Sequence, residues 1–138
     1  MDTIEDLVKE CHVMKEDDTI EDFLRLITGK RADMVAVVDR KGKLAGTLIE
    51  RDLLKVVVES PLAAMQPITN GHVNGTILKE PVTAIMRQPL CGRLSDRPHD
   101  ILAMMASQEF KSLMITDAEG RPAGCVRLAD IIRRLFSL

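Results

Sequence analysis

The sequence predicts an α/β fold built from two tandem β-α-β-β-α units. Residues 17–57 align without a gap on residues 95–135, at a constant offset of 78 residues. An internal repeat of this length indicates that one structural unit occurs twice. In each unit an apolar stripe with helical spacing is followed by short apolar runs that are typical of strands. We therefore expect one small module made of two similar halves.

A helix is expected near the start of each unit. The first unit carries the i, i+3, i+4, i+7 apolar stripe of a helix at Ile20, Phe23, Leu24 and Ile27. The second unit carries the same stripe at Pro98, Ile101, Leu102 and Met105. We predict that Asp18 and Asp96 are the N-caps of these helices. Gly29 is the expected stop signal of the first helix, which then spans about residues 19–29.

A hairpin is expected after each helix. The predicted strands are the segments 34–38 and 44–49 in the first unit and 113–116 and 122–127 in the second. The turns between them end in Gly42 and Gly120, which supply the positive φ that such turns need. The two hairpins therefore have the same predicted geometry.

A second helix is expected at the end of each unit, over residues 52–58 and 130–136, and the first residue of each segment is an aspartate that favours an N-cap. Short strands around Val13 and Cys91 complete the two units at their beginnings. The predicted boundaries are 3–58 for the first repeat, 59–80 for a connector and 81–136 for the second repeat. The connector is rich in proline and Asn-Gly pairs, which mark turns.

Composition excludes several classes of protein. The net charge is −2, and the chain has no Trp, no Tyr and three Phe, so basic patches and stacking platforms for nucleic acid are scarce. No apolar run approaches the length of a membrane span, and the first residues are acidic, unlike those of a signal peptide. We expect a cytoplasmic protein that binds neither membranes nor nucleic acid.

No catalytic or metal-binding motif is found. A nucleophile elbow, a phosphate-binding glycine loop and a zinc-protease motif are all missing from the sequence. The three histidines are dispersed, and the three cysteines form no CxxC pair. We interpret Cys11, Cys91 and Cys125 as small apolar fillers and predict that the protein is not an enzyme.

The stretch Gly-Thr-Leu-Ile-Glu-Arg-Asp from Gly46 to Asp52, and its equivalent from Gly124 to Asp130, occupy the same place in the two units. Together with the doubled β-α-β-β-α order, these stretches resemble those of a stand-alone pair of CBS domains, also called a Bateman module. The resemblance implies that the repeats pack sheet against sheet with pseudo-two-fold symmetry. It also implies two clefts that accept adenosine-containing ligands, and a homodimer.

The resemblance also suggests which residues bind a ligand. In the family the pattern Gly-x-x-(Thr or Ser)-x-x-Asp lines the cleft, where the hydroxyl holds phosphate or ribose and the aspartate accepts hydrogen bonds from the ribose diol. Here Ile49 and Arg127 replace the hydroxyl. Adenine is expected against the strand residues, and phosphate against Arg51 or Arg127. The predicted ligand-binding residues are Gly46, Thr47, Ile49, Arg51, Asp52, Met34 and Ala36 in the first cleft and Gly124, Arg127, Asp130, Ser112 and Met114 in the second.

Two functions follow from this resemblance. The first is a regulatory sensor that binds AMP, ATP or S-adenosylmethionine and transmits binding to a partner protein. The second is a ligand-independent dimerisation or interaction module with degenerate sites, which the replacements at Ile49 and Arg127 favour. The two aspartates have a structural explanation as helix caps, and the arginines have one as solvated charges.

Overall fold

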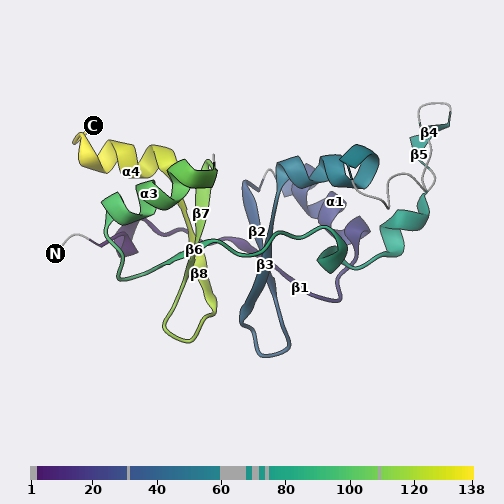
Figure 1. The fold of residues 1–138 in the computed structure, drawn as a ribbon, viewed down its shortest axis with the longest axis horizontal. Helices are drawn as coiled ribbons and strands as arrows, with labels where there is room; N and C mark the ends of the chain where they lie inside the picture. Colours follow the sequence, from purple (N-terminus) through teal and green to yellow (C-terminus); the bar gives the residue numbers. More distant parts are fainter. Residues whose placement is uncertain (1–2, 31, 60–67, 70–71, 74, 109) are drawn as a thin grey trace.

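The computed structural model describes residues 3–30, 32–59, 68–69, 72–73, 75–108 and 110–138, and it confirms the predicted α/β class. Two three-stranded sheets lie side by side at the centre of the molecule (Figure 1). The first consists of β1 (His12–Lys15), β2 (Met34–Val38) and β3 (Leu44–Ile49). The second consists of β6 (Cys91–Arg93), β7 (Ser112–Thr116) and β8 (Pro122–Arg127). In each sheet the middle strand is parallel to the first and antiparallel to the third.

The hairpins follow the predicted boundaries, apart from β7, which begins one residue early. Met34 pairs with Ile49 in the first hairpin, and Ser112 pairs with Arg127 in the second, so the register is also repeated at an offset of 78. Gly42 and Gly120 have φ angles of 79° and 81°, a region that favours glycine. The two turns also meet, because the Leu44 N–H donates to the Gly120 carbonyl at 2.9 Å.

The first helices, α1 (Ile20–Lys30) and α3 (Pro98–Gln108), lie on the outer sides of the two central sheets, α1 beside the first sheet and α3 beside the second (Figure 1). Their predicted caps are wrong by one residue. Thr19 caps α1, because its hydroxyl accepts the Asp22 N–H at 3.2 Å while Asp22 accepts the Thr19 N–H at 3.0 Å. The Asp18 carboxylate turns back to accept the Lys15 N–H, and the equivalent Asp96 accepts a strand N–H in the same way. The helix α1 also continues through Gly29 to Lys30.

The final helices also differ from the prediction. The first repeat has a 3-10 turn, η2 (Glu50–Asp52), and a π-helical segment, η3 (Lys55–Glu59), whereas the second has the α-helix α4 (Leu128–Leu135). Neither aspartate is the N-cap, because Ile49 and Arg127 occupy those positions. Asp52 is instead the third residue of its turn, and its carboxylate reaches back to accept the Ile49 N–H at 2.8 Å.

The leading segments of the two repeats are exchanged. Residues 3–9, which include the 3-10 turn η1 (Glu5–Leu7), pack on the second repeat, where Ile4 is fully buried with Ile101 and Leu113. Residues 75–87, with the 3-10 turns η4 (Gly75–Lys79) and η5 (Val82–Ala84), add Ile77, Val82 and Ile85 to the core of the first repeat. Each packing unit therefore contains a piece of the other sequence repeat.

Each leading segment crosses the last strand of the other repeat. Lys9 and Cys125 exchange two backbone hydrogen bonds of 2.9 Å, and the equivalent pair, Arg87 and Thr47, exchanges bonds of 2.9 and 3.1 Å. Glycine is required at both crossings: a Cβ atom on Gly124 would lie 2.2 Å from the Lys9 carbonyl oxygen, and one on Gly46 would lie 2.8 Å from that of Arg87. These glycines thus allow the two repeats to interlock.

A separate apolar layer joins the two sheets. Met34, Ala36 and Met114 are buried in it, and the partly buried Cys11, Leu44, Ile49, Cys91 and Phe110 pack around them. Part of the connector is described: β4 (Ile68–Thr69) pairs with β5 (His72–Val73). Residues 60–67, 70–71 and 74 lie outside the described residues. Across the described ranges, no helix has the length and apolar character needed to cross a bilayer.

Candidate functional site

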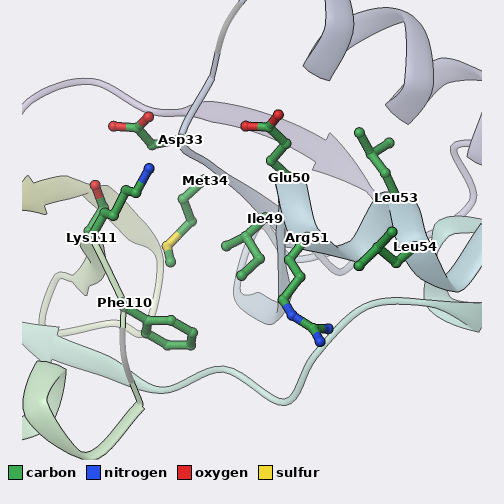
Figure 2. Close-up of a pocket in the computed structure, with 10 residues that line it drawn as sticks. Asp33, Met34, Ile49, Glu50, Arg51, Leu53, Leu54, Phe110 and Lys111 are labelled. Atoms are coloured by element: carbon green, nitrogen blue, oxygen red, sulfur yellow. The ribbon is translucent and has the colours of Figure 1, made fainter. Parts of the chain in front are cut away.

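A cavity of about 520 Å³ opens where the first repeat meets the second (Figure 2). The start of β2, the end of β3 and the η2 turn form one side of it, and the residues just before and at the start of β7 form the other. It is lined by Asp33, Met34, Ile49, Glu50, Arg51, Leu53, Leu54, Phe110, Lys111 and Ser112. Its position follows from the hairpin register, which brings the first residue of β2 beside the last residue of β3.

The cavity has an apolar wall. Met34 and Ile49 are paired across β2 and β3, so their side chains lie on the same face of the sheet. Figure 2 shows the thioether of Met34 and the side chain of Ile49 beside the ring of Phe110, which comes from the second repeat. A wall of one aromatic ring, one thioether chain and one branched aliphatic chain suits a flat apolar group.

Polar groups surround this wall. Arg51 and Lys111 supply positive charge, and Glu50 and Asp33 supply carboxylates. The Ser112 side chain is 3% exposed, and its hydroxyl oxygen has no hydrogen-bond partner among the described residues. A buried hydroxyl without a partner is unfavourable, so a hydrogen bond from a molecule in the cavity to this atom would remove that cost.

Asp52 does not line the cavity. It is fully buried, and its carboxylate accepts hydrogen bonds from the Arg87 guanidinium at 2.9 and 3.1 Å. The Lys55 ammonium lies 3.0 Å from the same carboxylate and also donates to the Ile85 carbonyl. The predicted site aspartate thus connects the η2 turn to the exchanged segment 75–87.

Asp130 has a looser version of the same arrangement. Lys9, which is equivalent to Arg87, brings its ammonium to 3.5 Å from Asp130, whose side chain is 23% exposed. The contact is an ion pair without hydrogen-bond geometry, since the nearer carboxylate oxygen has no hydrogen-bond partner in the described part of the chain. Arg133 stands near it in a shallow polar hollow. The Asp52 carboxylate is therefore enclosed by cations, whereas the Asp130 side chain is partly exposed and has one buried carboxylate oxygen without a hydrogen-bond partner in the described part of the chain.

Arg127 lies where Ile49 lies in the first repeat. Its guanidinium is 3.2 Å from the Asp33 carboxylate, so it joins the two repeats by an ion pair. This ion pair occupies the position where pseudo-two-fold symmetry would place the wall of a second cleft. The two halves of the molecule are therefore chemically unequal at their junction.

The structure brings together four of the twelve predicted site residues, namely Met34, Ile49, Arg51 and Ser112. Gly46, Thr47 and Gly124 lie at the strand crossings, and Ala36 and Met114 lie in the apolar layer between the sheets. Sequence reasoning missed Asp33, Glu50, Leu53, Leu54, Phe110 and Lys111. Four of these residues are next in sequence to a predicted site residue, and this adjacency was the signal that could have identified them: Asp33, Glu50, Leu53 and Lys111.

Among the described residues, no group of three or more His, Cys, Asp or Glu side chains has an arrangement that could hold a metal ion.

Known proteins share both the sequence pattern and the fold. Residues 4–59 match the family model of the CBS domain. The chain is 26% identical over 152 residues to the uncharacterized protein MJ1426 of Methanocaldococcus jannaschii, covering 96% of this chain and 90% of that protein. Its fold resembles that of CBSX2, a CBS-pair protein of Arabidopsis thaliana solved in complex with AMP, with a TM-score of 0.76, 23% identity and coverage of 99% and 98%.

A second solved structure adds a further ligand. The cytosolic domain of the Mg²⁺ channel MgtE in complex with ATP gives a TM-score of 0.72 at 24% identity. That match covers 96% of this chain but 48% of the other, so this chain spans about half of that structure. Residues 4–59 thus match the CBS domain family, and since the second repeat reproduces the strand order, register and crossing of the first, the whole chain has the fold of a tandem CBS pair.

Proposed function

We propose that this CBS pair is a cytoplasmic regulatory module that binds an adenosine-containing ligand in the cavity between its repeats and transmits binding to a partner protein. The observation that carries the proposal is the buried, unpartnered hydroxyl of Ser112 beside an apolar wall that contains Phe110. The complexes of CBSX2 with AMP and of MgtE with ATP support the choice of ligand class.

The cavity offers each part of such a ligand a matching group. The adenine ring would lie against Phe110 and Met34, where stacking and apolar contact supply the affinity. The Ser112 hydroxyl would bond to a ring nitrogen or to the exocyclic amine, because a hydroxyl both donates and accepts. Arg51 and Lys111 would distinguish the ligands by charge. Their positive charges attract the phosphates of AMP or ATP and repel the sulfonium of S-adenosylmethionine.

We assign the ribose diol to the Glu50 carboxylate and not to Asp52. A carboxylate offers two acceptor oxygens to two neighbouring hydroxyls, and Glu50 lines the cavity. Asp52 already accepts hydrogen bonds from Arg87 and from the Ile49 N–H, so ligand binding by Asp52 would first require breaking these contacts. The ligand-binding roles predicted from sequence for Asp52 and Asp130 stay predictions, which titration of the Asp52→Asn and Asp130→Asn variants with the same ligands tests.

Calorimetric titration of AMP, ATP and S-adenosylmethionine tests this proposal. We expect Phe110→Ala to weaken binding about 5- to 150-fold, the loss of one stacked base at about 1–3 kcal/mol. Ser112→Ala should weaken it about 2- to 10-fold, the net loss of one hydrogen bond. Leu138→Ala is the control, because that side chain is 80% exposed and lies outside both the cavity and the proposed dimer surface. Affinities that are equal in all four proteins would refute the proposed site.

A second function is favoured by exposed apolar side chains on the last segment of each repeat. Val58 is 70% exposed, and Leu135 and Phe136 are 51% and 69% exposed. Such residues indicate a contact surface, and we propose that they form a homodimer. Light scattering should then give about twice the 15.3 kDa mass of one chain.

The calorimetric titration also separates the two functions. If ligand-free protein gives no heat with any of the three ligands, the ligand-independent interaction module is the function that the data favour. Because the chain has no Trp or Tyr, absorbance at 260 nm reveals whether a nucleotide has co-purified.

A further inference from the structure

Two of the three cysteines meet where the N-terminal segment crosses the second repeat. Lys9 is paired with Cys125 through two backbone hydrogen bonds, and Cys11 follows Lys9 by two residues. The Cys11 sulfur lies 3.8 Å from the Met114 sulfur, and Met114 is the β7 residue directly paired with Cys125 on β8. Cys11 and Cys125 are thus neighbours of the same methionine on one face of the sheet.

The environment makes the two thiols chemically different. A hydrogen bond between their side chains is the largest influence on both groups: it lowers the pKa of Cys11 and raises the pKa of Cys125. Both residues are partly exposed. The thiolate is the reactive form of cysteine, so the lowered pKa of Cys11 favours Cys11 as the first thiol of the pair to react.

Cys91 is an internal comparison. It also pairs with Met114, but from β6, on the opposite side of β7 from Cys125. Two strand spacings, about 10 Å, therefore separate Cys91 from Cys125, and a disulfide needs Cα atoms no more than about 7 Å apart. Cys91 instead contacts the Thr116 hydroxyl at 3.9 Å. The strand order thus excludes a Cys91–Cys125 pair, whereas Cys11 contacts the methionine that is paired with Cys125.

We propose that Cys11 and Cys125 form a redox modification site, at which a peroxide converts the two thiols into a disulfide that fastens the N-terminal segment to the second repeat. The Cys11 thiolate attacks one peroxide oxygen, the O–O bond breaks, and sulfenic acid and water are formed. The Cys125 sulfur then attacks the Cys11 sulfur, the S–O bond breaks, and the hydroxide leaves as water with the Cys125 proton. The two thiols lose two electrons, and one peroxide becomes two waters.

The disulfide would reach the ligand cavity through direct packing. Cys11 belongs to the apolar layer that also contains Met34, Ile49 and Phe110, and these three side chains form the apolar wall of the cavity. The crosslink would join residues 114 positions apart in the sequence, and closing so long a loop stabilises the folded state. The site does not depend on the proposed ligand, because its chemistry needs only the two thiols and a peroxide.

The test uses the whole chain, hydrogen peroxide and thiol alkylation. Wild type should lose two of its three alkylatable thiols and about 2 Da of monomer mass. Trypsin should then release a crosslink between the peptides 10–15 and 112–127. The Cys91→Ser variant should behave like wild type, and its melting temperature should rise by several degrees on oxidation and fall again with dithiothreitol.

Three outcomes would overturn the proposal. The first is a crosslink that contains Cys91 or that joins two chains. The second is a Cys11 that advances to sulfinic acid while Cys125 stays alkylatable. The third is an intramolecular mass loss of the same size in Cys11→Ser or Cys125→Ser, since each of these variants lacks one member of the pair.

Discussion

Asp52→Asn should destabilise the protein by about 3 kcal/mol, whereas Asp130→Asn should cost less than about 1 kcal/mol. Asparagine retains an oxygen to accept the Ile49 N–H, so the change at Asp52 removes the charge and keeps that bond. Asp52 is fully buried, and removing one partner of a buried ion pair costs about 3–5 kcal/mol. Arg87 and Lys55 are 27% and 29% exposed and regain some hydration, which places the value at the lower end.

The same substitution at Asp130 is the matched control, because the two aspartates are equivalent in the repeat. The partner of Asp130, Lys9, is 67% exposed and 3.5 Å away, and exposed pairs contribute about 0–1 kcal/mol. The assay is urea unfolding followed by far-ultraviolet circular dichroism, since the chain has no Trp or Tyr for fluorescence. Equal losses of stability in the two variants would refute the argument from burial.

Two further predictions concern α1. Phe23→Ala should cost about 3–5 kcal/mol, because the ring is fully buried, while Leu138→Ala, at a side chain that is 80% exposed, should stay within about 0.5 kcal/mol in the same urea assay. Hydrogen bonds from the Thr19 N–H and then its hydroxyl lower the pKa of Asp22. The stability that Asp22 contributes is therefore present above the ordinary carboxyl pKa and is lost as the pH falls through the lowered value. Melting temperatures of wild type and Asp22→Asn should differ at pH 7 and converge near about pH 2; a constant difference would contradict this.

The internal repeat was sufficient to predict the strands and hairpins of the two repeats, but not the β4–β5 pair in the connector. The segments 34–38, 44–49 and 122–127 are strands with the predicted bounds. These bounds could be predicted because turn glycines and apolar runs are features of the local sequence. The caps were displaced by a residue, because Asp18 and Thr19 are both good capping residues and the choice depends on the turn after β1. That turn gives Asp18 the Lys15 N–H as a partner.

The site was predicted less well, for a topological reason. A repeat shows that residue 4 and residue 82 are equivalent, but it does not show on which repeat each one packs. The exchange brings Arg87 to Asp52, and it thereby removes from the cavity wall the aspartate that the motif singled out. Phe110 and Lys111 reach the cavity from the opposite repeat, so no pattern within one repeat could identify them.

The exchange of leading segments determines the smallest unit that can fold. The leading segment of each repeat packs in the core of the other repeat. A single repeat on its own would therefore expose the apolar side chains of its leading segment, and its core would lack the segment that fills it. Two copies satisfy both needs at once, as in a domain-swapped dimer, whether or not they are covalently connected. We therefore expect that two fragments made by cutting the chain within the connector stay bound to each other, because each fragment supplies the segment that completes the core of the other.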